Sequence, residues 1–174
     1  MITDNFGITS NGNLIIPRGK LGLSPIELDL QEIIKAERKV PEMARSTPIT
    51  LPDLITTFNV AIIVLAKAIS IVELERRDAK RELEFAESIF TLDYAEEVLS
   101  QKGIKSSVDA RKAAANVSPM VIGPQQTYDI LTTASEYLQN LRSGLEMAYH
   151  GAKKICDVYV RTPDQHVYAG ERHE

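Results

Sequence analysis

The strongest constraint on the fold is an apolar repeat in the last third of the chain, whose steps alternate strictly between three and four residues. The repeat consists of Leu131, Ala134, Leu138, Leu141, Leu145, Ala148, Ala152, Ile155 and Tyr159. Only an α-helix places residues with this spacing on one stripe. We therefore predict a helix from Gln125 to about Arg161, with Pro124 at its first position and Thr162-Pro163 as its stop.

A second long helix is predicted between Pro52 and about Gln101, because no Gly or Pro interrupts the chain after Pro52. Its repeat consists of Phe58, Ile62, Leu65, Ile69 and Val72, followed by Arg76, Ala79, Leu83, Ala86 and Phe90. Two helices of this length bury their stripes by pairing. The predicted fold class is therefore all-α, a long antiparallel helical hairpin of residues 52–101 and 124–161 with heptad seams.

Shorter elements surround this hairpin. Asn11-Gly12 lies between two weakly alternating apolar stretches in residues 5–16, which predicts a β-hairpin or an extended arm; a disordered terminus is the alternative. A helix is expected from Ser24-Pro25 to about Met43, and another over 107–116, after a Gly103 C-cap. The expected organisation is an arm (1–23), a helical oligomerisation domain (24–162) and a tail (163–174).

Composition and charge exclude several classes of protein. The net charge of −4 excludes a uniformly basic DNA-coating protein, and a single cysteine, Cys156, excludes an intrachain disulfide. The first 20 residues lack the pattern of a signal peptide. The apolar segment 60–72 is short for a membrane span and contains Lys67 and Ser70. We expect a cytoplasmic protein with no membrane contact, in the host cytoplasm if it is phage-encoded.

The first half of the second long helix carries more apolar residues than one seam needs. Ile63, Val64, Ala68 and Ile71 form a second apolar face, which a single intramolecular hairpin does not cover. We therefore predict a homo-oligomer. The predicted interface consists of Phe58, Ile62, Ile63, Leu65, Ile69 and Val72, together with Leu138, Leu141 and Leu145.

Two groups of cations are candidates for phosphate binding. The first is a helical stripe of Arg76, Arg77, Lys80 and Arg81, and the second is a basic loop region with Lys102, Lys105, Arg111 and Lys112. The alternative for the stripe is a solvated face, because acidic residues at three and four positions away can pair with it.

The sequence offers little for catalysis. It has no Gly-rich phosphate loop and no cysteine pair for zinc. Glu146 and His150 lie one helical turn apart, but the paired Glu-x-x-His motifs of a di-iron bundle are missing. We expect no catalytic residue, no metal and no cofactor.

Two stretches resemble the UvsY-like recombination mediator family of tailed phages. One is Asp78-Ala79-Lys80-Arg81-Glu82-Leu83-Glu84-Phe85-Ala86, and the other runs from Asp129 through Arg142 to Met147–Asp157. The resemblance implies a small helical homo-oligomer that binds single-stranded DNA and loads a RecA-type recombinase onto strands coated by single-strand-binding protein. Lys80 and Arg81 match the family's DNA-contacting stretch. The acidic net charge, the first fifty residues, and Glu82 at an expected basic position depart from it.

The expected function is therefore that of a non-enzymatic recombination mediator. Its partners would be further copies of itself, single-stranded DNA, a RecA-type recombinase and a single-strand-binding protein. The alternative is a structural, adaptor or phage assembly protein that acts only through helical oligomerisation. A third reading is an immunity or anti-defence binder.

Overall fold

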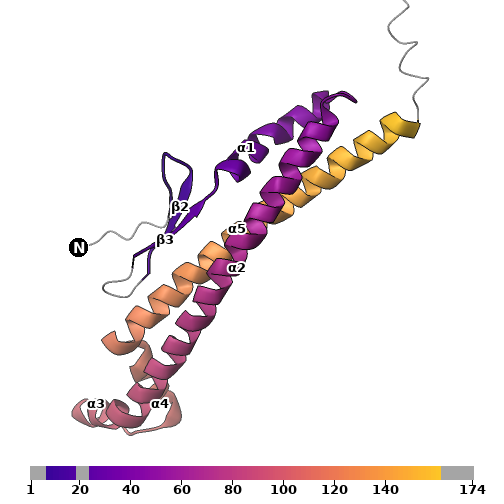
Figure 1. Cartoon of the computed structure of the whole chain (residues 1–174). Coiled ribbons are helices and arrows are strands. Elements are labelled where there is room, and N and C mark those ends of the chain that lie inside the picture. The colour runs from indigo at the N-terminus through magenta and orange to yellow at the C-terminus, as the bar shows by residue number, and fades with distance from the viewer. Residues whose placement is uncertain (1–6, 19–23, 162–174) are drawn as a thin grey trace, which may run out of the picture. The chain divides into compact units, whose positions relative to one another are not determined.

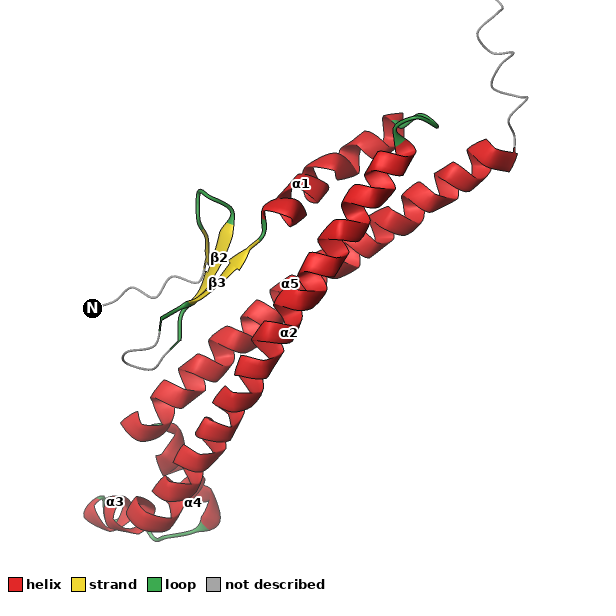
Figure 2. Ribbon diagram, in the orientation of Figure 1, coloured by secondary structure: helices red, strands yellow, loops and turns green. Residues whose placement is uncertain are grey.

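The computed structural model describes residues 7–18 and 24–161. The strands are β1 (Gly7–Ile8), β2 (Asn13–Ile16) and β3 (Ile26–Asp29) (Figures 1 and 2). The helices are α1 (Gln31–Lys39), the 3-10 helix η1 (Val40–Arg45), α2 (Leu51–Ile89), the π-helix η2 (Phe90–Tyr94), α3 (Ala95–Gln101), α4 (Val108–Asn116) and α5 (Pro119–Arg161). The predicted stop at Thr162-Pro163, the tail and residues 5 and 6 lie outside the described residues.

The predicted fold class is confirmed: the chain is all-α, with a small β-sheet near its N-terminus. Together, α2, η2 and α3 form one helix of 51 residues, Leu51–Gln101. The chain divides into two compact units. The first contains the described residues up to Leu28 together with Ala68–Tyr137, and the second contains Asp29–Lys67 together with the residues from Leu138. Each unit thus joins one end of α2 to the opposite end of α5, so the two helices are antiparallel.

In the first unit, the predicted hairpin is present. β1 and β2 pair antiparallel, and Gly12 in the turn has a φ of 81°, a conformation that glycine adopts without a steric penalty. The Thr9 amide donates to the Asn13 carbonyl over 2.8 Å, which closes the turn. β3 adds a third strand beside β2.

The prediction that a helix begins at Ser24-Pro25 is wrong, because residues 26–29 form strand β3. Ile26 and Leu28 are buried while Glu27 and Asp29 are exposed, which is the period of two that a strand requires. The helix begins only at Gln31, whose amide donates to Asp29 Oδ1 over 2.9 Å. The Asp29 carboxylate therefore binds the first amide of α1, while Leu30 occupies the N-cap position and makes no side-chain capping bond.

The far end of the first unit has a small core of its own. Leu83, Ala86, Phe90 and Ala95 from the α2–α3 helix are buried together with Ala115 and Val121. Gly103 has a φ of 66° after α3, as the predicted C-cap requires. The Ser107 hydroxyl accepts from the Ala110 amide over 3.1 Å and caps α4, which runs over 108–116.

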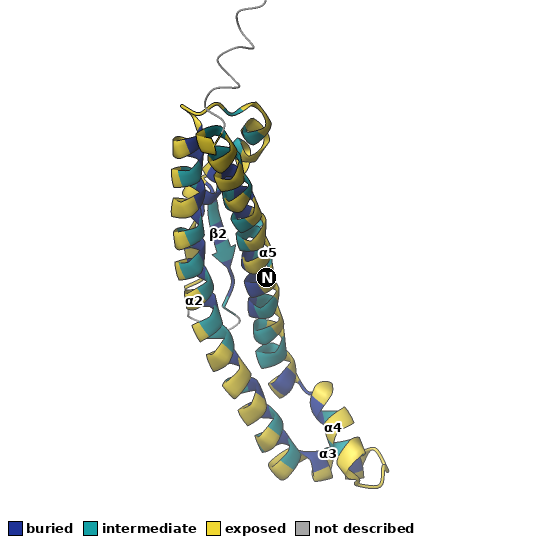
Figure 3. Cartoon of the chain, turned by 90° about the vertical axis from the view of Figure 1, so that its right-hand side faces the viewer, coloured by how far each residue is buried: buried dark blue, intermediate teal, exposed yellow. Residues whose placement is uncertain are grey.

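In the second unit, α1, α2 and α5 contribute the buried residues. They include Ile33 and Ala36 of α1, Phe58 and Leu65 of α2, and Leu145 and Ala152 of α5. Figure 3 shows that buried residues follow one side of α2 and one side of α5. Close to η1, a Cβ added at Gly151 would lie 2.9 Å from Met43 Cε, so glycine lets this methionine approach α5.

The predicted start of the last helix is also wrong, because α5 begins at Pro119 and Pro124 lies inside it. The amides of Val121 and Ile122 donate to the Ser118 carbonyl, and the Met120 amide donates to Ser118 Oγ. Ser118 therefore caps the helix, and Pro119 takes the first position that was predicted for Pro124. The predicted seam itself is correct, since each of its nine residues is buried or half-buried.

Candidate interaction surfaces

A polar network in the first unit joins the segment after β2 to α2 and α5. Arg18 forms an ion pair with Glu75. Two residues earlier on α2, Glu73 accepts a hydrogen bond from the Ser135 hydroxyl of α5 and pairs with Arg76 over 2.8 Å. Arg76, a predicted phosphate ligand, is therefore held by a carboxylate of its own helix.

Glu73 is the acid whose ionisation this network controls. The hydrogen bond from Ser135 lowers the pKa of Glu73 most, and the hydrogen bond and charge of Arg76 and the charge of Arg77 lower it further. Partial burial opposes these effects by raising it. The carboxylate form is therefore favoured in the folded chain.

The rest of the predicted helical stripe faces acids as well. Lys80 Nζ lies 3.8 Å from Glu84, and Arg81 lies 3.2 Å from Asp78. Within residues 7–18 and 24–161, Arg77 has no ion pair. Most of this stripe is thus balanced along the same helix, as expected for a solvated mixed-charge face.

The second group of cations lies around the connection between α3 and α4, and we call it the basic turn (Lys102, Lys105, Arg111 and Lys112). All residues of the connection are exposed, and so is Lys112. Arg111 donates a hydrogen bond from its Nε to Ser106 Oγ over 2.8 Å. Its guanidinium also forms an ion pair with Glu96 over 3.8 Å. In the described part of the chain, the three lysines have no ion pair. The basic turn therefore leaves more cationic charge open than α2 does.

An open hollow of about 670 Å³ lies beside the basic turn. Its lining residues are Glu87, Ser88, Thr91, Leu92, Val108, Arg111, Lys112, Ala115 and Asn116. Two cations meet one acid and several apolar side chains here. The hollow can take an amphipathic, net anionic group, although Glu87 reduces its preference for negative charge.

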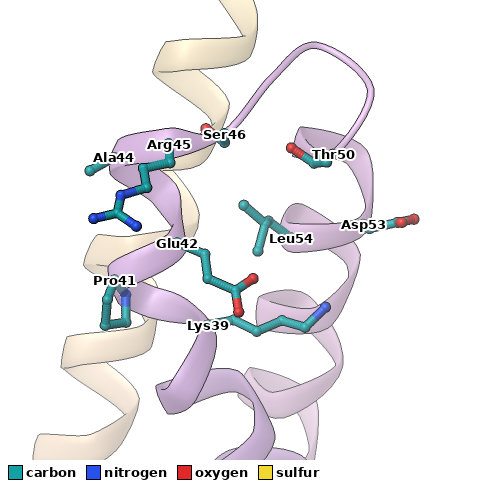
Figure 4. Close-up of a pocket in the computed structure, with 9 residues that line it drawn as sticks. All are labelled: Lys39, Pro41, Glu42, Ala44, Arg45, Ser46, Thr50, Asp53 and Leu54. Atoms are coloured by element: carbon teal, nitrogen blue, oxygen red, sulfur yellow. The ribbon is translucent and has the colours of Figure 1, made fainter.

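A second hollow, of about 570 Å³, lies in the other unit between η1 and the start of α2 (Figure 4). Its lining residues are Lys39, Pro41, Glu42, Ala44, Arg45, Ser46, Thr50, Asp53 and Leu54. In Figure 4, Glu42 and Lys39 extend towards α2 whereas Arg45 points away from it. Two acids and two bases balance, so the hollow has no charge preference.

Some residues of the predicted oligomer interface are buried within one chain, and others are exposed. Phe58, Leu65, Val72, Leu138 and Leu145 are buried inside one chain, Ile62, Ile69 and Leu141 are half-buried, and Ile63 is exposed. The buried seam of α2 is Phe58, Ala61, Leu65, Ala68 and Val72, rather than the predicted set with Ile62 and Ile69. The homo-oligomer itself stays a prediction.

An apolar stripe remains exposed on α2, and we define it by Val60, Ile63, Ile71 and Leu74. Their exposed fractions are 40%, 49%, 46% and 61%. At about 100° per residue, the stripe and the buried seam are centred about 140° apart around the helix. Among the described residues, the packing therefore covers one side of α2 and leaves this stripe on the other side exposed. Val60 and Leu74 were not among the predicted residues, although their spacing of seven from Lys67 was readable in the sequence.

The same helix bears on membrane contact. In the described part of the chain, one helix, Leu51–Gln101, is long and apolar enough to cross a membrane, with a mean hydropathy of 2.1 over its most apolar 18 residues. One such helix is weak evidence for a span, because the core helices of soluble proteins pass the same test; 28% of this window is buried inside the chain.

Metal-binding and nucleophilic groups are dispersed. Across the residues that the structure describes, no group of three His, Cys, Asp or Glu side chains could hold a metal ion. Glu146 pairs with Arg142 over 2.8 Å, and His150 packs edge-on against Tyr149. Cys156 is half-buried on α5.

Comparison with known proteins gives no relative. No family model, no curated protein and no solved structure matches this chain. Functional conclusions therefore depend on the surfaces described above.

Proposed function

We propose that the protein is a non-enzymatic, self-associating helical protein that serves as an adaptor or assembly component in the cytoplasm. The observation that carries this proposal is the apolar stripe of α2. Exposed apolar area costs about 25 cal/mol per Å² relative to burial, so four large aliphatic side chains in one row favour association. The spacing of the stripe suits a helix of a partner.

Self-association is tested by light scattering on the full chain at micromolar concentration. We expect the wild-type mass to exceed the 19.3 kDa of one chain, and Ile63→Glu to return it to that value. Ile49→Glu is the matched control, because Ile49 is 87% exposed and lies off the stripe. A wild-type mass of one chain would contradict the proposal, as would an equal effect of both substitutions.

The basic turn favours a second candidate, a recombination mediator. Here single-stranded DNA contacts Lys102, Lys105 and Lys112, and repeated copies of this weak site act together by avidity. The further partners in this candidate are a RecA-type recombinase and a single-strand-binding protein. Support comes from these three lysines, which have no ion pair within the described ranges, while the paired charges of α2 argue for a small contribution from Arg76, Lys80 and Arg81.

Fluorescence anisotropy with a short labelled single strand separates the two candidates. A mediator binds at low salt, weakens steeply as salt rises, and loses binding when the three lysines are replaced by Glu. The charge-matched control replaces Lys35, Lys39 and Lys154, which lie outside the basic turn. Absence of DNA binding at low salt would contradict the mediator and leave the adaptor as the remaining candidate.

A further inference from the structure

We propose that two copies of the chain pair through the apolar stripe in an antiparallel, two-fold symmetric register centred on Lys67. This inference rests on the self-association proposed above and adds the direction and register of the contact. It commits to a second copy of this chain as the occupant of the exposed face of α2.

The first argument is the spacing of the stripe on both sides of Lys67. Val60 and Leu74 lie seven residues before and after it, and Ile63 and Ile71 lie four before and after it. Because all of these residues belong to the single helix α2, their placement follows from helix geometry alone. At about 100° per residue, they fall within about 40° of the direction of Lys67.

A two-fold interface requires such a self-complementary surface, since one patch must contact its own copy. In the antiparallel pair, Val60 lies level with the partner's Leu74 and Ile63 lies level with the partner's Ile71. Every aliphatic residue of the stripe then meets another one. A parallel pair would also align like with like, so the apolar residues alone do not fix the direction.

Charge at the ends of the stripe favours the antiparallel direction. Asp53 and Arg81 lie fourteen residues before and after Lys67, and both fall within about 40° of the same face. Arg81 is 79% accessible and lies 3.2 Å from Asp78, which is on the same face of the helix, so a partner's carboxylate would share Arg81 with Asp78. The antiparallel register places Arg81 level with the partner's Asp53 at both ends. A parallel register would oppose Asp53 to Asp53 and Arg81 to Arg81.

Lys67 at the centre explains why a second chain fits better than a lipid bilayer. A charged side chain in the middle of a membrane span is costly, whereas in a helix pair a long lysine can turn its ammonium to the solvent at the edge. A single polar residue in an apolar seam also fixes register at a cost in stability.

The test uses two single variants of the full chain, Ile63→Glu and Ile71→Lys, measured alone and mixed by native mass spectrometry. Each alone is expected to be monomeric, because it places a charge against an isoleucine. The mixture is expected to recover a heterodimer, since the antiparallel register puts the two opposite introduced charges level while the remaining isoleucines still meet. Circular dichroism of each variant confirms that it is folded.

Each outcome decides a different point. A wild-type chain that is monomeric overturns both self-association and this register. A wild-type dimer whose variants fail to complement overturns the antiparallel register and leaves the proposed function standing. Binding of a monomeric wild-type chain to phosphatidylcholine vesicles would assign the stripe to a membrane instead.

A second measurement uses the end charges, which avoids substitutions in the apolar stripe. Asp53→Arg should weaken dimerisation by about three- to tenfold through two like-charge contacts, and adding Arg81→Asp in the same chain should restore it. Equal affinity of all three proteins would contradict the register.

Discussion

The two halves of α2 share one helical period and differ in what they expose. Up to Val72, the side opposite the buried seam carries Val60, Ile63 and Ile71, with one lysine among them. Leu74 completes this stripe, and beyond it the exposed positions of α2 are mostly charged and paired along the helix, as Arg81 is with Asp78. The predicted repeat matches the buried face in the second half and misplaces two residues, Ile62 and Ile69, in the first half. The two halves differ in the side chains on the opposite face, which are apolar in the first half and charged in the second.

The buried seam of α2 gives the largest expected effect on stability. Phe58→Ala should lower the free energy of unfolding by about 3–5 kcal/mol, because a fully buried aromatic ring leaves a cavity. Urea denaturation measures this change. Phe85→Ala on the charged half is the control, since Phe85 is 67% exposed and should change stability by less than about 0.5 kcal/mol. Equal losses would contradict the burial described.

Lys67 tests the exposed side of the first half. Lys67→Leu should tighten self-association by about tenfold, because it removes two facing charges from an apolar contact and completes the stripe. Sedimentation equilibrium over a range of concentrations measures the dissociation constant. Lys80→Leu on the second half should leave the constant within about twofold. An unchanged constant for Lys67→Leu would place this residue outside the contact.

Glu73 marks the boundary between the halves and gives a pH dependence. Its folded pKa is lowered from the ordinary value of 4.5, so its stabilising effect is present above that value. The effect is lost as the pH falls through the lower, folded pKa. Ser135→Ala removes the main cause and should raise the pKa towards 4.5, with a loss of about 1 kcal/mol at pH 7. Carboxyl NMR measures the pKa of Glu73, and denaturation between pH 3 and 7 measures the free energy of unfolding. The control is Thr133→Ala, because Thr133 is exposed on α5.

The paired charges of the second half should contribute least. Lys80→Ala removes a pair with Glu84 in which both side chains are about 60% exposed. The expected loss is about 0.3–0.5 kcal/mol, and it should shrink in high salt. A loss above 1 kcal/mol in thermal denaturation would show that this face is packed rather than solvated.

Sequence motifs that are compatible with only one local structure were predicted correctly. Asn11-Gly12 forms the predicted hairpin turn and Gly103 follows the helix as the predicted C-cap, and both glycines have a positive φ. Errors arose where one sequence motif is compatible with two local structures. Ser24-Pro25 followed by Glu27 imitates a helix start, and only packing shows that Ile26 and Leu28 are buried in a strand. Ser118-Pro119 and Pro124 both suit a helix start, and the earlier one is used.

The candidate surfaces were readable only in part, for the same reason. The cations of α2 are visible in the sequence, but their acids at three and four residues decide whether they are open. The apolar excess of α2 was also visible. Which of its residues stay exposed depends on which residues α2 buries. The structure buries Ala61 and Ala68 instead of the predicted Ile62 and Ile69, so the exposed face includes Val60 and Leu74.

The central claim is that a second copy of the chain covers the exposed face of α2. Sedimentation equilibrium of the wild-type chain at micromolar concentration tests it most directly. We expect a mass of twice 19.3 kDa that falls towards 19.3 kDa on dilution. A mass of 19.3 kDa at every concentration would contradict the claim.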